Sequence, residues 1–462
     1  MERLYARNDD LCPRAPTQTV RRNDAEDSGR KALKTKLLVF FIPLCMAQPQ
    51  TLSPDLLKDA FTRPTMRLSQ FEQLAIEANP TLEQAEAQVS LSAAQARQAG
   101  LPPNPSVGYE GAEIRGGSFG GGEQGAFIAQ TFVLGGKLGL RRNVYKQQER
   151  EDELGVTEQR YRILSAVDQS FYSALAAQEL VRVRHRLLEL ASDAAQTAHQ
   201  LANIGQADAP DVLQAEVEAE QARVDYINAQ RNYLEAFRTL AILCGKPELP
   251  VTPLEGDLEH PPVLDPDRIL HQIMQNSPSI KRAQQAVVRA AAEVKSAERE
   301  NIPDLQIQAG LQQNLEPLNG SSGKPVGLQG FAVAAITLPI FNRNQGNIAA
   351  AKAERTQAQA EVTRTQLALR KAAEPLIQDY LAHLEEVSRY KNDIIPRATR
   401  AYQLYLEKYH QMAAAYPQVI ISQRTLFQFE MSYILALQQV WQDAVQLQNY
   451  ALSGGLDTVK PF

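Results

Sequence analysis

The sequence predicts a mainly α-helical protein that also carries strands of a membrane β-barrel and is built from two internal repeats. Three observations predict this class. The same order of elements occurs twice, roughly 200 residues apart. Two helical patterns are long enough for coiled coils rather than for a compact domain. Short segments with alternating apolar and polar residues indicate strands that face lipid on one side.

The composition fits long helices. The chain has 462 residues, of which 44% are hydrophobic and 22% charged, so it can bury a sizeable core. Aromatic residues make up only 6%, which favours close helix packing through small side chains over a thick α/β core. A net charge of −5 and the lack of a basic stripe with interleaved aromatics argue against nucleic acid as a partner.

Residues 1–47 are interpreted as an N-terminal extension followed by a signal peptide. The basic stretch RKALKTK at 30–36 precedes the apolar stretch LLVFFIPLCMA at 37–47, which is too short to span a bilayer. Cleavage after Ala47 is one outcome, and lipidation at Cys45 is the alternative. Residues 1–29 do not resemble a signal, which is consistent with a true start further along the chain. Export is therefore expected.

The cysteines do not form a disulfide framework. The chain contains Cys12, Cys45 and Cys244, and only Cys244 remains after removal of residues 1–47. Stability must then come from packing. Beyond residue 47 no run of about eighteen apolar residues occurs, so no membrane-spanning helix is predicted.

The mature chain divides into two halves that share one order of elements. The first repeat covers 66–245 and the second covers 264–453, with a linker at 246–263 between them. Each repeat opens with a short helix, an Xaa-Pro step and a longer helix, and continues with two strands, at 103–134 and 303–340. Such duplication is typical of a repeat-built architecture.

Each pair of strands leads into a long helical hairpin, at 138–243 and 344–450. Apolar residues in the first hairpin recur at alternating spacings of three and four, which predicts coiled-coil packing. Pro375 and Pro396 should kink or interrupt the second hairpin. Such kinks are either the moving part of a gate or simple structural accommodation. The recurring residues are Leu180, Val183, Leu187, Leu190 and Ala194.

The strand at 305–313 has apolar residues on one face and glutamines on the other, over the length that a tilted membrane strand needs. Four strands per chain cannot close a barrel, because small barrels need about eight. The open edges must therefore pair with other copies of the chain.

Two turns connect the strands to the long helices. They lie in QTFVLGGKLGLRRN at 130–143 and ITLPIFNRNQGNIAAAKAE at 336–354, where residues 336–340 are expected to end a membrane strand. Glycine, proline and asparagine are typical of such turns. The residues assigned to these barrel-to-tunnel joints are Gly135, Gly136, Lys137, Pro339, Asn342, Arg343 and Gly346.

The doubled layout and these two motifs resemble the TolC-type outer-membrane factor family, over residues 66–453, and most closely its cobalt–zinc–cadmium heavy-metal efflux branch. The resemblance implies a homotrimer in the outer-membrane lipid of a Gram-negative cell. Its twelve-strand barrel, with four strands from each chain, would stand on a long coiled-coil periplasmic tunnel. A periplasmic membrane-fusion adaptor and an inner-membrane efflux pump are the implied partners, and no cofactor is implied.

The hairpin tips are the candidate functional positions. Asp208 and Asp211 are expected to begin a helix, as the Asp-Ala-Pro-Asp order suggests, or to form acidic rings at a periplasmic entrance that favour cations, and the two roles can coexist. The resemblance also implies adaptor contacts at the tips, and a simple tight turn is the alternative. The residues assigned to these contacts are Gly205, Gln206, Ala207, Ala209, Pro210, Leu213, Met412, Ala413, Tyr416, Pro417 and Val419.

Catalytic and metal sites are not predicted. The glycine-rich loops lack the Lys-Ser or Lys-Thr of a phosphate-binding loop. No two of the six histidines lie four residues apart, and no nucleophile motif occurs. The predicted function is a passive outer-membrane exit duct of a tripartite resistance-nodulation-division type efflux system for heavy-metal cations. The alternatives are multidrug efflux, type I protein secretion, or a periplasmic coiled-coil structural protein.

Overall fold

The computed structural model describes residues 57–58, 60–114, 122–205, 208–317, 323–411, 413 and 416–458. The chain forms two units, Met1–Leu52 and Ser53–Phe462, and all described residues belong to the second. The predicted signal peptide and lipidation site Cys45 lie outside the described residues. The same holds for the tip candidates Gln206, Ala207 and Met412.

The first half of the described chain is built from short helices, a strand pair and a long hairpin. Asn79 begins the second helix, because its Oδ1 accepts a hydrogen bond from Thr81 N at 3.0 Å and Pro80 occupies the first turn. The elements are β1 (Met66–Arg67), α1 (Leu68–Ala78), α2 (Pro80–Ala99), β2 (Ser106–Ala112), β3 (Glu123–Phe132), α3 (Lys137–Asn203) and α4 (Ala209–Leu243).

The second half follows the same order. Asp265 begins its first helix by accepting hydrogen bonds from Asp267 N and Arg268 N. A two-residue strand β4 (Leu254–Glu255) pairs with β1 in parallel. The further elements are α5 (Pro266–Asn276), α6 (Pro278–Arg299), β5 (Leu305–Pro317), β6 (Pro325–Ile336), α7 (Gln345–Arg389), the π-helix η1 (Tyr390–Ile394), α8 (Ile395–His410) and α9 (Tyr416–Gln448).

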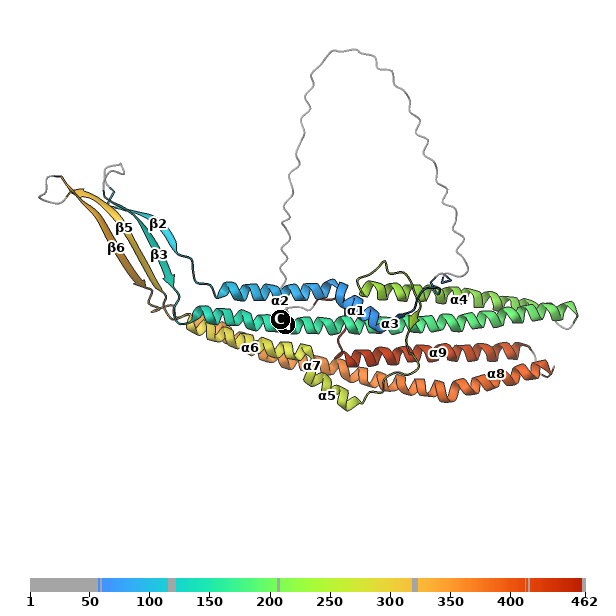
Figure 1. The fold of residues 1–462 in the computed structure, drawn as a ribbon. Helices are drawn as coiled ribbons and strands as arrows, with labels where there is room; N and C mark the ends of the chain where they lie inside the picture. Colours follow the sequence, from blue (N-terminus) through green and yellow to red (C-terminus); the bar gives the residue numbers. More distant parts are fainter. Residues whose placement is uncertain are drawn as a thin grey trace, which may run out of the picture. The chain divides into compact units, whose positions relative to one another are not determined.

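The long helices lie side by side, and the strands continue from one end of them (Figure 1). Helix α3 packs against α2, α4, α6 and α9, and α7 packs against α6 and α9. The main core lies where α1 and the linker meet the long helices. There Phe71 contacts the rings of Phe171 and Phe237, and Trp441 stacks on Tyr172 at 3.9 Å.

The four larger strands form one antiparallel sheet in the order β2-β3-β5-β6. Its register places Ile128 opposite Ala309 and Val107, on an apolar face that is largely exposed. The opposite face is polar: Gln308 Nε2 donates to Glu110 Oε2 at 3.2 Å. Within the described residues β2 and β6 each pair with one strand only, so each leaves one edge open.

The strand that leads into α7 ends earlier than the sequence predicted. Pairing stops at Ile336, whereas the expected strand continued to Ile340. Pro339 has no N–H to donate to a ladder, and Ile340 N turns back to donate to Leu338 O at 3.0 Å. The last four residues of the predicted strand therefore form the turn.

The spacing in the first hairpin only partly describes its packing. Leu190 is 40% exposed rather than part of a seam. Ala191 is buried in its place, in a cluster with Ala219 and Ala222 of α4. Small side chains let α3 and α4 approach closely, which leaves the adjacent leucine outside.

Pro375 does not interrupt its helix, because α7 continues through it to Arg389. The regular α-helix ends instead at η1, directly before Pro396 in the first turn of α8. A π-bulge re-routes backbone hydrogen bonds near a residue that cannot donate one. Of the two prolines, only Pro396 adjoins a break in the helix.

A membrane-spanning helix was not predicted. Among the described helices, none combines the length and apolar character that would let it cross a membrane.

Candidate functional site: joints, hairpin tips and linker

The first joint is a two-glycine turn between β3 and α3. Gly135 and Gly136 both have φ of +71°, a left-handed conformation that residues with a Cβ rarely adopt. A Cβ on Gly135 would also lie 2.6 Å from Ile302 Cδ1. The turn can therefore be this tight only with glycine at Gly135.

Lys137 is the first residue of α3, and its side chain is almost fully buried, with 3% exposed. Its Nζ lies 2.6 Å from Asp304 Oδ1 and donates to Ile302 O at 2.9 Å. Asp304 Oδ1 also accepts from Leu134 N at 3.1 Å. One carboxylate thus fastens the end of β3 and the start of α3 to the beginning of β5.

Sequence reasoning selected Lys137 but not its partner Asp304. The only available signal was the Pro-Asp step directly before the alternating strand, which by itself indicates a turn. Nearby, Arg141 Nε and Nη2 donate to the two carboxylate oxygens of Glu300 at 2.9 and 2.8 Å. This bidentate ion pair is a second ionic contact between the two halves of the chain, after that of Lys137 with Asp304.

The second joint uses asparagine where the first uses glycine. Asn344 precedes α7 with φ of +61°, and its Nδ2 donates to Ala297 O at 2.8 Å. Asn342 Oδ1 accepts from Asn344 N, and Arg343 Nε donates to Ile340 O at 3.3 Å. Asparagine tolerates this conformation better than other residues with a Cβ. Asn344 was not among the predicted site residues, although its side chain donates a hydrogen bond to Ala297 of α6.

Among the other predicted joint residues, Gly346 lies in the first turn of α7. A Cβ added to Gly346 would have no atom within 4 Å. Pro339 lies in the irregular segment after β6. The structure therefore assigns the specific contacts at the joints to Lys137, Asn342 and Arg343, and it adds Asp304 and Asn344.

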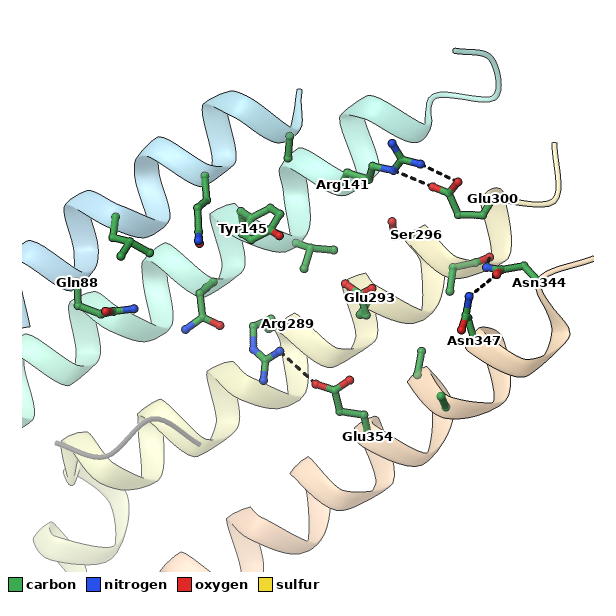
Figure 2. Close-up of a pocket in the computed structure, with 18 of the residues that line it drawn as sticks. Gln88, Arg141, Tyr145, Arg289, Glu293, Ser296, Glu300, Asn344, Asn347 and Glu354 are labelled. Carbon is green, nitrogen blue, oxygen red and sulfur yellow. Dashed lines mark hydrogen bonds and ion pairs between the residues drawn. The ribbon is translucent and has the colours of Figure 1, made fainter. Parts of the chain in front are cut away.

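A cavity of about 1090 Å³ lies next to the joints, lined by α2, α3, α6 and α7. Figure 2 shows that Arg289 reaches Glu354, and Arg289 Nε also donates to Glu151 Oε2 at 3.0 Å. Burial and the carboxylates of Glu354 and Glu300 raise the pKa of Glu293. Over the described residues no group of three His, Cys, Asp or Glu side chains is placed to hold a metal ion.

The first hairpin tip corrects one prediction. Asp208 occupies the N-cap position of α4, but its side chain makes no capping hydrogen bond. Its backbone carbonyl accepts from Asp211 N at 3.0 Å and Val212 N at 3.3 Å. Asp211 lies in the first turn of α4, where a carboxylate is favoured by the helix dipole. The carboxylate of Asp208 is therefore not used to begin the helix.

The other predicted residues of this tip lie on both sides of the turn. Gly205 has φ of +74° and follows the end of α3. Ala209 and Pro210 are the first residues of α4, and Leu213 is 60% exposed. The described part of the tip therefore presents small residues and one exposed leucine.

At the second tip, α8 ends at His410 and α9 begins at Tyr416. Ala413 N donates to Lys408 O at 2.8 Å. The Tyr416 ring lies 5.5 Å from that of Tyr409 and also packs on the cluster of Ala198, Val212 and Ala215 from the first hairpin. Pro417 follows Tyr416, and Val419 is buried. Tyr416 thus connects the two hairpins near their tips.

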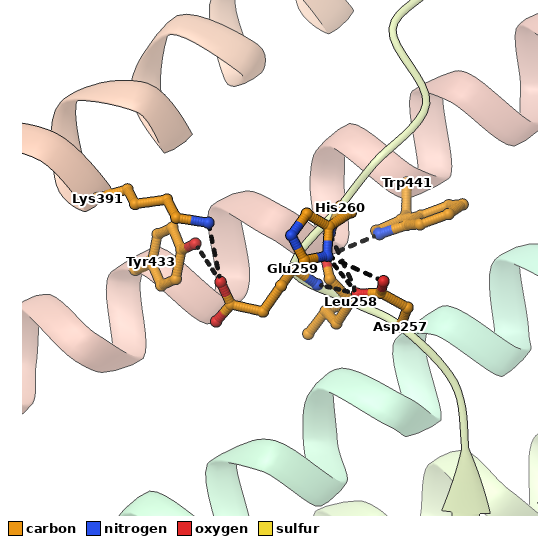
Figure 3. Close-up of polar contacts among 7 residues, drawn as sticks. All are labelled: Asp257, Leu258, Glu259, His260, Lys391, Tyr433 and Trp441. Atoms are coloured by element: carbon orange, nitrogen blue, oxygen red, sulfur yellow. Dashed lines mark hydrogen bonds and ion pairs between the residues drawn. The ribbon is translucent and has the colours of Figure 1, made fainter.

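The linker between the halves is a further contact that sequence reasoning did not find. Figure 3 shows Glu259 accepting hydrogen bonds from Lys391 of η1, at 3.2 Å, and from Tyr433 of α9, at 3.0 Å. Trp441 Nε1 donates to Leu258 O at 3.0 Å. The linker therefore holds the second hairpin at the position of its π-bulge.

Comparison with known proteins decides the family. A family model described as "Outer membrane efflux protein" matches residues 72–246 and 269–452. The chain belongs to this family. As an outer membrane efflux protein it is a transport duct and not an enzyme, and it resides in the outer membrane with a large periplasmic part.

Two curated relatives of this efflux protein carry metal-resistance or lipoprotein names. The cobalt-zinc-cadmium resistance protein CzcC of Cupriavidus metallidurans is 26% identical over 316 residues, covering 68% of this chain and 74% of CzcC. The probable outer membrane lipoprotein SilC of Salmonella typhimurium is 24% identical over 273 residues, covering 57% of this chain and 58% of SilC.

Solved structures support the fold. The structure of CusC has a TM-score of 0.67 with 18% identity, and the match covers 84% of this chain and 92% of CusC. The open-state MtrE outer membrane channel of Neisseria gonorrhoeae has a TM-score of 0.65 with 20% identity, over 84% of this chain and 89% of MtrE. The efflux protein therefore has the fold of these channels.

Proposed function

We propose that this efflux protein is the outer-membrane exit duct of a tripartite resistance-nodulation-division type system that exports heavy-metal cations. The observation that supports this best is the match to CzcC, whose name refers to cobalt, zinc and cadmium, over two thirds of the chain. A periplasmic adaptor and an inner-membrane pump supply the energy, and the duct conducts passively. The absence of a metal-chelating group among the described residues is compatible with a conduit that releases its cargo.

The proposed assembly is a homotrimer with a twelve-strand barrel in outer-membrane lipid. Each copy supplies the sheet β2-β3-β5-β6, and the open edge of β6 pairs with β2 of the next copy. The apolar face of the sheet contacts lipid and the face with Glu110 and Gln308 lines the water-filled interior. The long helices continue this barrel as a coiled-coil tunnel.

The proposed architecture consists of two internal repeats, 66–245 and 264–453, joined by the linker 246–263. The recurring element order supports this, as do the two successive ranges matched by the family model. In this architecture the two joints are equivalent positions, with Gly136 in the first corresponding to Asn344 in the second, since both have positive φ before a long helix.

Two measurements test this proposal. The protein, extracted from the outer-membrane fraction, should run on gels as a heat-modifiable trimer. A deletion strain should become more sensitive to cobalt, zinc or cadmium and recover with the wild-type gene. Recovery only as a monomer would contradict the barrel. Unchanged metal sensitivity combined with increased drug sensitivity would contradict the metal cargo.

A multidrug duct is the second candidate function. Residues of this chain match the antibiotic efflux pump outer membrane protein ArpC of Pseudomonas putida at 27% identity, but over only 39% of the chain. Type I protein secretion is a weaker alternative, because the names of the relatives described above do not refer to it. A periplasmic structural protein is not proposed, because the family is one of outer membrane transport proteins.

The double substitution Asp208→Ala with Asp211→Ala should raise single-channel conductance or lower cation selectivity in planar bilayers. In a trimer these carboxylates form two rings at the periplasmic entrance, and rings of acids favour cations. Asp193→Ala on the exposed face of α3 is the matched control. Unchanged conductance and selectivity in the double variant would show that the tip acids do not form the ring.

A further inference from the structure

An exposed apolar stripe continues past the last paired residue of β6 into the second joint. Pairing ends at Ile336, and beyond it apolar residues recur at Leu338, Ile340 and Phe341. All four are exposed, and Phe341 is 91% exposed. Three further apolar side chains are exposed beside the first joint: Leu101, Phe132 and Leu134. The exposed apolar surface of the sheet therefore extends beyond the sheet, towards the long helices.

The carboxylates near the joints are all used in ion pairs. The four stretches of chain that form and adjoin the joints are 100–105, 132–142, 298–305 and 336–347. They contain three carboxylates, and each lies within 4 Å of a cationic nitrogen. The pairs are Asp304 with Lys137, Glu300 with Arg141 and Glu298 with Lys352. These carboxylates are therefore not available to balance the other cations of the same stretches.

Arg142, Arg299 and Arg343 are those other cations. All three are exposed, and in the described part of the chain no ion pair joins any of them to a carboxylate. Arg142 lies beside the end of α2, since a Cβ on Gly100 would be 3.0 Å from its Cδ. Arg299 is the last residue of α6, and Arg343 Nε donates to Ile340 O within the apolar turn. Unpaired guanidinium groups and exposed apolar side chains thus occur together at the joints.

This combination matches the boundary of a phospholipid layer. Apolar and aromatic side chains enter the acyl region there, while arginines reach the headgroups. Guanidinium groups bind phosphate in a bidentate geometry. The joints lie where the sheet of this outer-membrane protein meets its periplasmic helices (Figure 1), which is the level of the inner leaflet. The lipids of that leaflet are phospholipids.

Another copy of the chain is a poorer occupant of this surface. In a trimer each copy brings the same three unpaired arginines to the same level. The joints then repel one another, because like charges gather around one ring. An anionic lipid between or around the copies offsets this repulsion, and a neutral lipid does not.

We propose that the two joints form a binding surface for anionic phospholipid of the inner leaflet. The turn Leu338–Phe341 enters the boundary of the acyl chains, and Arg142, Arg299 and Arg343 bind the phosphate headgroups. The contact holds the protein at a fixed depth in the membrane. This inference rests on the proposed barrel, because it requires the sheet to span the outer membrane.

The test measures which lipid the full-length protein retains. The protein is solubilised in detergent, immobilised, and incubated with micelles holding equal amounts of phosphatidylglycerol and phosphatidylcholine with identical acyl chains. Retained lipid is extracted and measured by mass spectrometry. Wild type should retain an excess of phosphatidylglycerol, and the excess should shrink at high salt because screening weakens charge contacts. Inorganic phosphate should displace no more lipid than sodium chloride does at equal ionic strength, since it gains nothing from the apolar turn.

The triple variant Arg142→Gln, Arg299→Gln and Arg343→Gln should lose this excess. Each cation near an anionic lipid surface contributes about fivefold to binding. A matched control removes the same charge from exposed positions on α3, α4 and α8 and should retain lipid like wild type. It carries Arg160→Gln, Arg231→Gln and Arg400→Gln. Phe341→Ser should lower the retention of both lipids alike.

Equal retention of both lipids by the wild type would overturn the proposal, as would an unchanged excess in the triple joint variant. Displacement of the lipid by inorganic phosphate would show a simple anion site instead. Loss of trimers in Phe341→Ser with unchanged lipid retention would show that another copy covers the turn. The salt series needs only the wild type, so it decides the question if the triple variant does not fold. Trimers are followed separately on gels: wild-type trimers without a lipid preference refute this surface alone, whereas a lack of trimers contradicts the barrel.

Discussion

Replacing Lys137 with methionine is expected to lower the free energy of unfolding by about 3 kcal/mol and to reduce the yield of the proposed trimer. The ammonium group is buried, and its removal takes the cationic partner from Asp304 Oδ1, which keeps only the hydrogen bond from Leu134 N, and takes the side-chain donor from Ile302 O. Loss of one partner from a buried ion pair costs about 3–5 kcal/mol, and the lower figure applies because Asp304 is 32% exposed. The effect should be concentrated at the start of α3.

Urea unfolding of the purified protein, followed by circular dichroism, measures this loss. Lys146→Met is the matched control, because Lys146 is exposed on the same helix two and a half turns further on. If Lys137→Met and Lys146→Met unfold at the same urea concentration, the joint is not held by this pair. Asp304→Asn should give an intermediate loss, since the amide still accepts from Lys137.

Replacing Asp168 with asparagine is expected to remove a fall in stability that the wild type shows as the pH rises. Burial, followed by the charge of Glu72 and a hydrogen bond to it, raises the pKa of Asp168 to about 8. A side-chain hydrogen bond with Asn449 has the smallest effect and lowers this pKa. A carboxyl group with a folded-state pKa above its unfolded value binds more protons when folded. Its stabilising contribution is therefore present at low pH and is lost as the pH rises from about 4 through 8.

Thermal unfolding at intervals from pH 5 to pH 9 tests this expectation. The melting temperature of the wild type should fall more steeply over this range than that of Asp168→Asn, and the two should differ most at pH 8 and above. Asp193→Asn, on the exposed face of α3, is the control and should follow the wild type. Parallel curves for wild type and Asp168→Asn would show that Asp168 does not carry the proton.

Much of the fold could be predicted because its signals are local. Asn79-Pro80 and Ser277-Pro278 mark helix starts within one turn, and helices α2 and α6 begin there. The alternation at 305–313 predicted β5 because a strand directs successive side chains to opposite faces. The family resemblance was confirmed by the family match. These features depend on a few neighbouring residues, and the sequence alone carries them.

The predictions that were wrong concern features that depend on interactions between segments distant in the sequence. Pro339 is a local signal against a strand that reaches Ile340, but it does not fix Ile336 as the last paired residue, because pairing with Leu305 decides that. The exposure of Leu190 follows from the alanines that α4 presents to α3. The effect of Pro375 could not be read from proline alone, since the helix continues through it.

The sequence by itself determined the class of this protein: the doubled element order, the long hairpins, the strand pairs and the glycine and asparagine turns between them. Only the tertiary structure decided which charges meet. Lys137 pairs with Asp304 and Arg282 pairs with Glu158, each across more than a hundred residues of chain. The physical reason is that helix and strand periodicity are set by near neighbours. The partner of a buried charge is set by how each helix is rotated against its neighbour. That rotation depends on how all the long helices pack together.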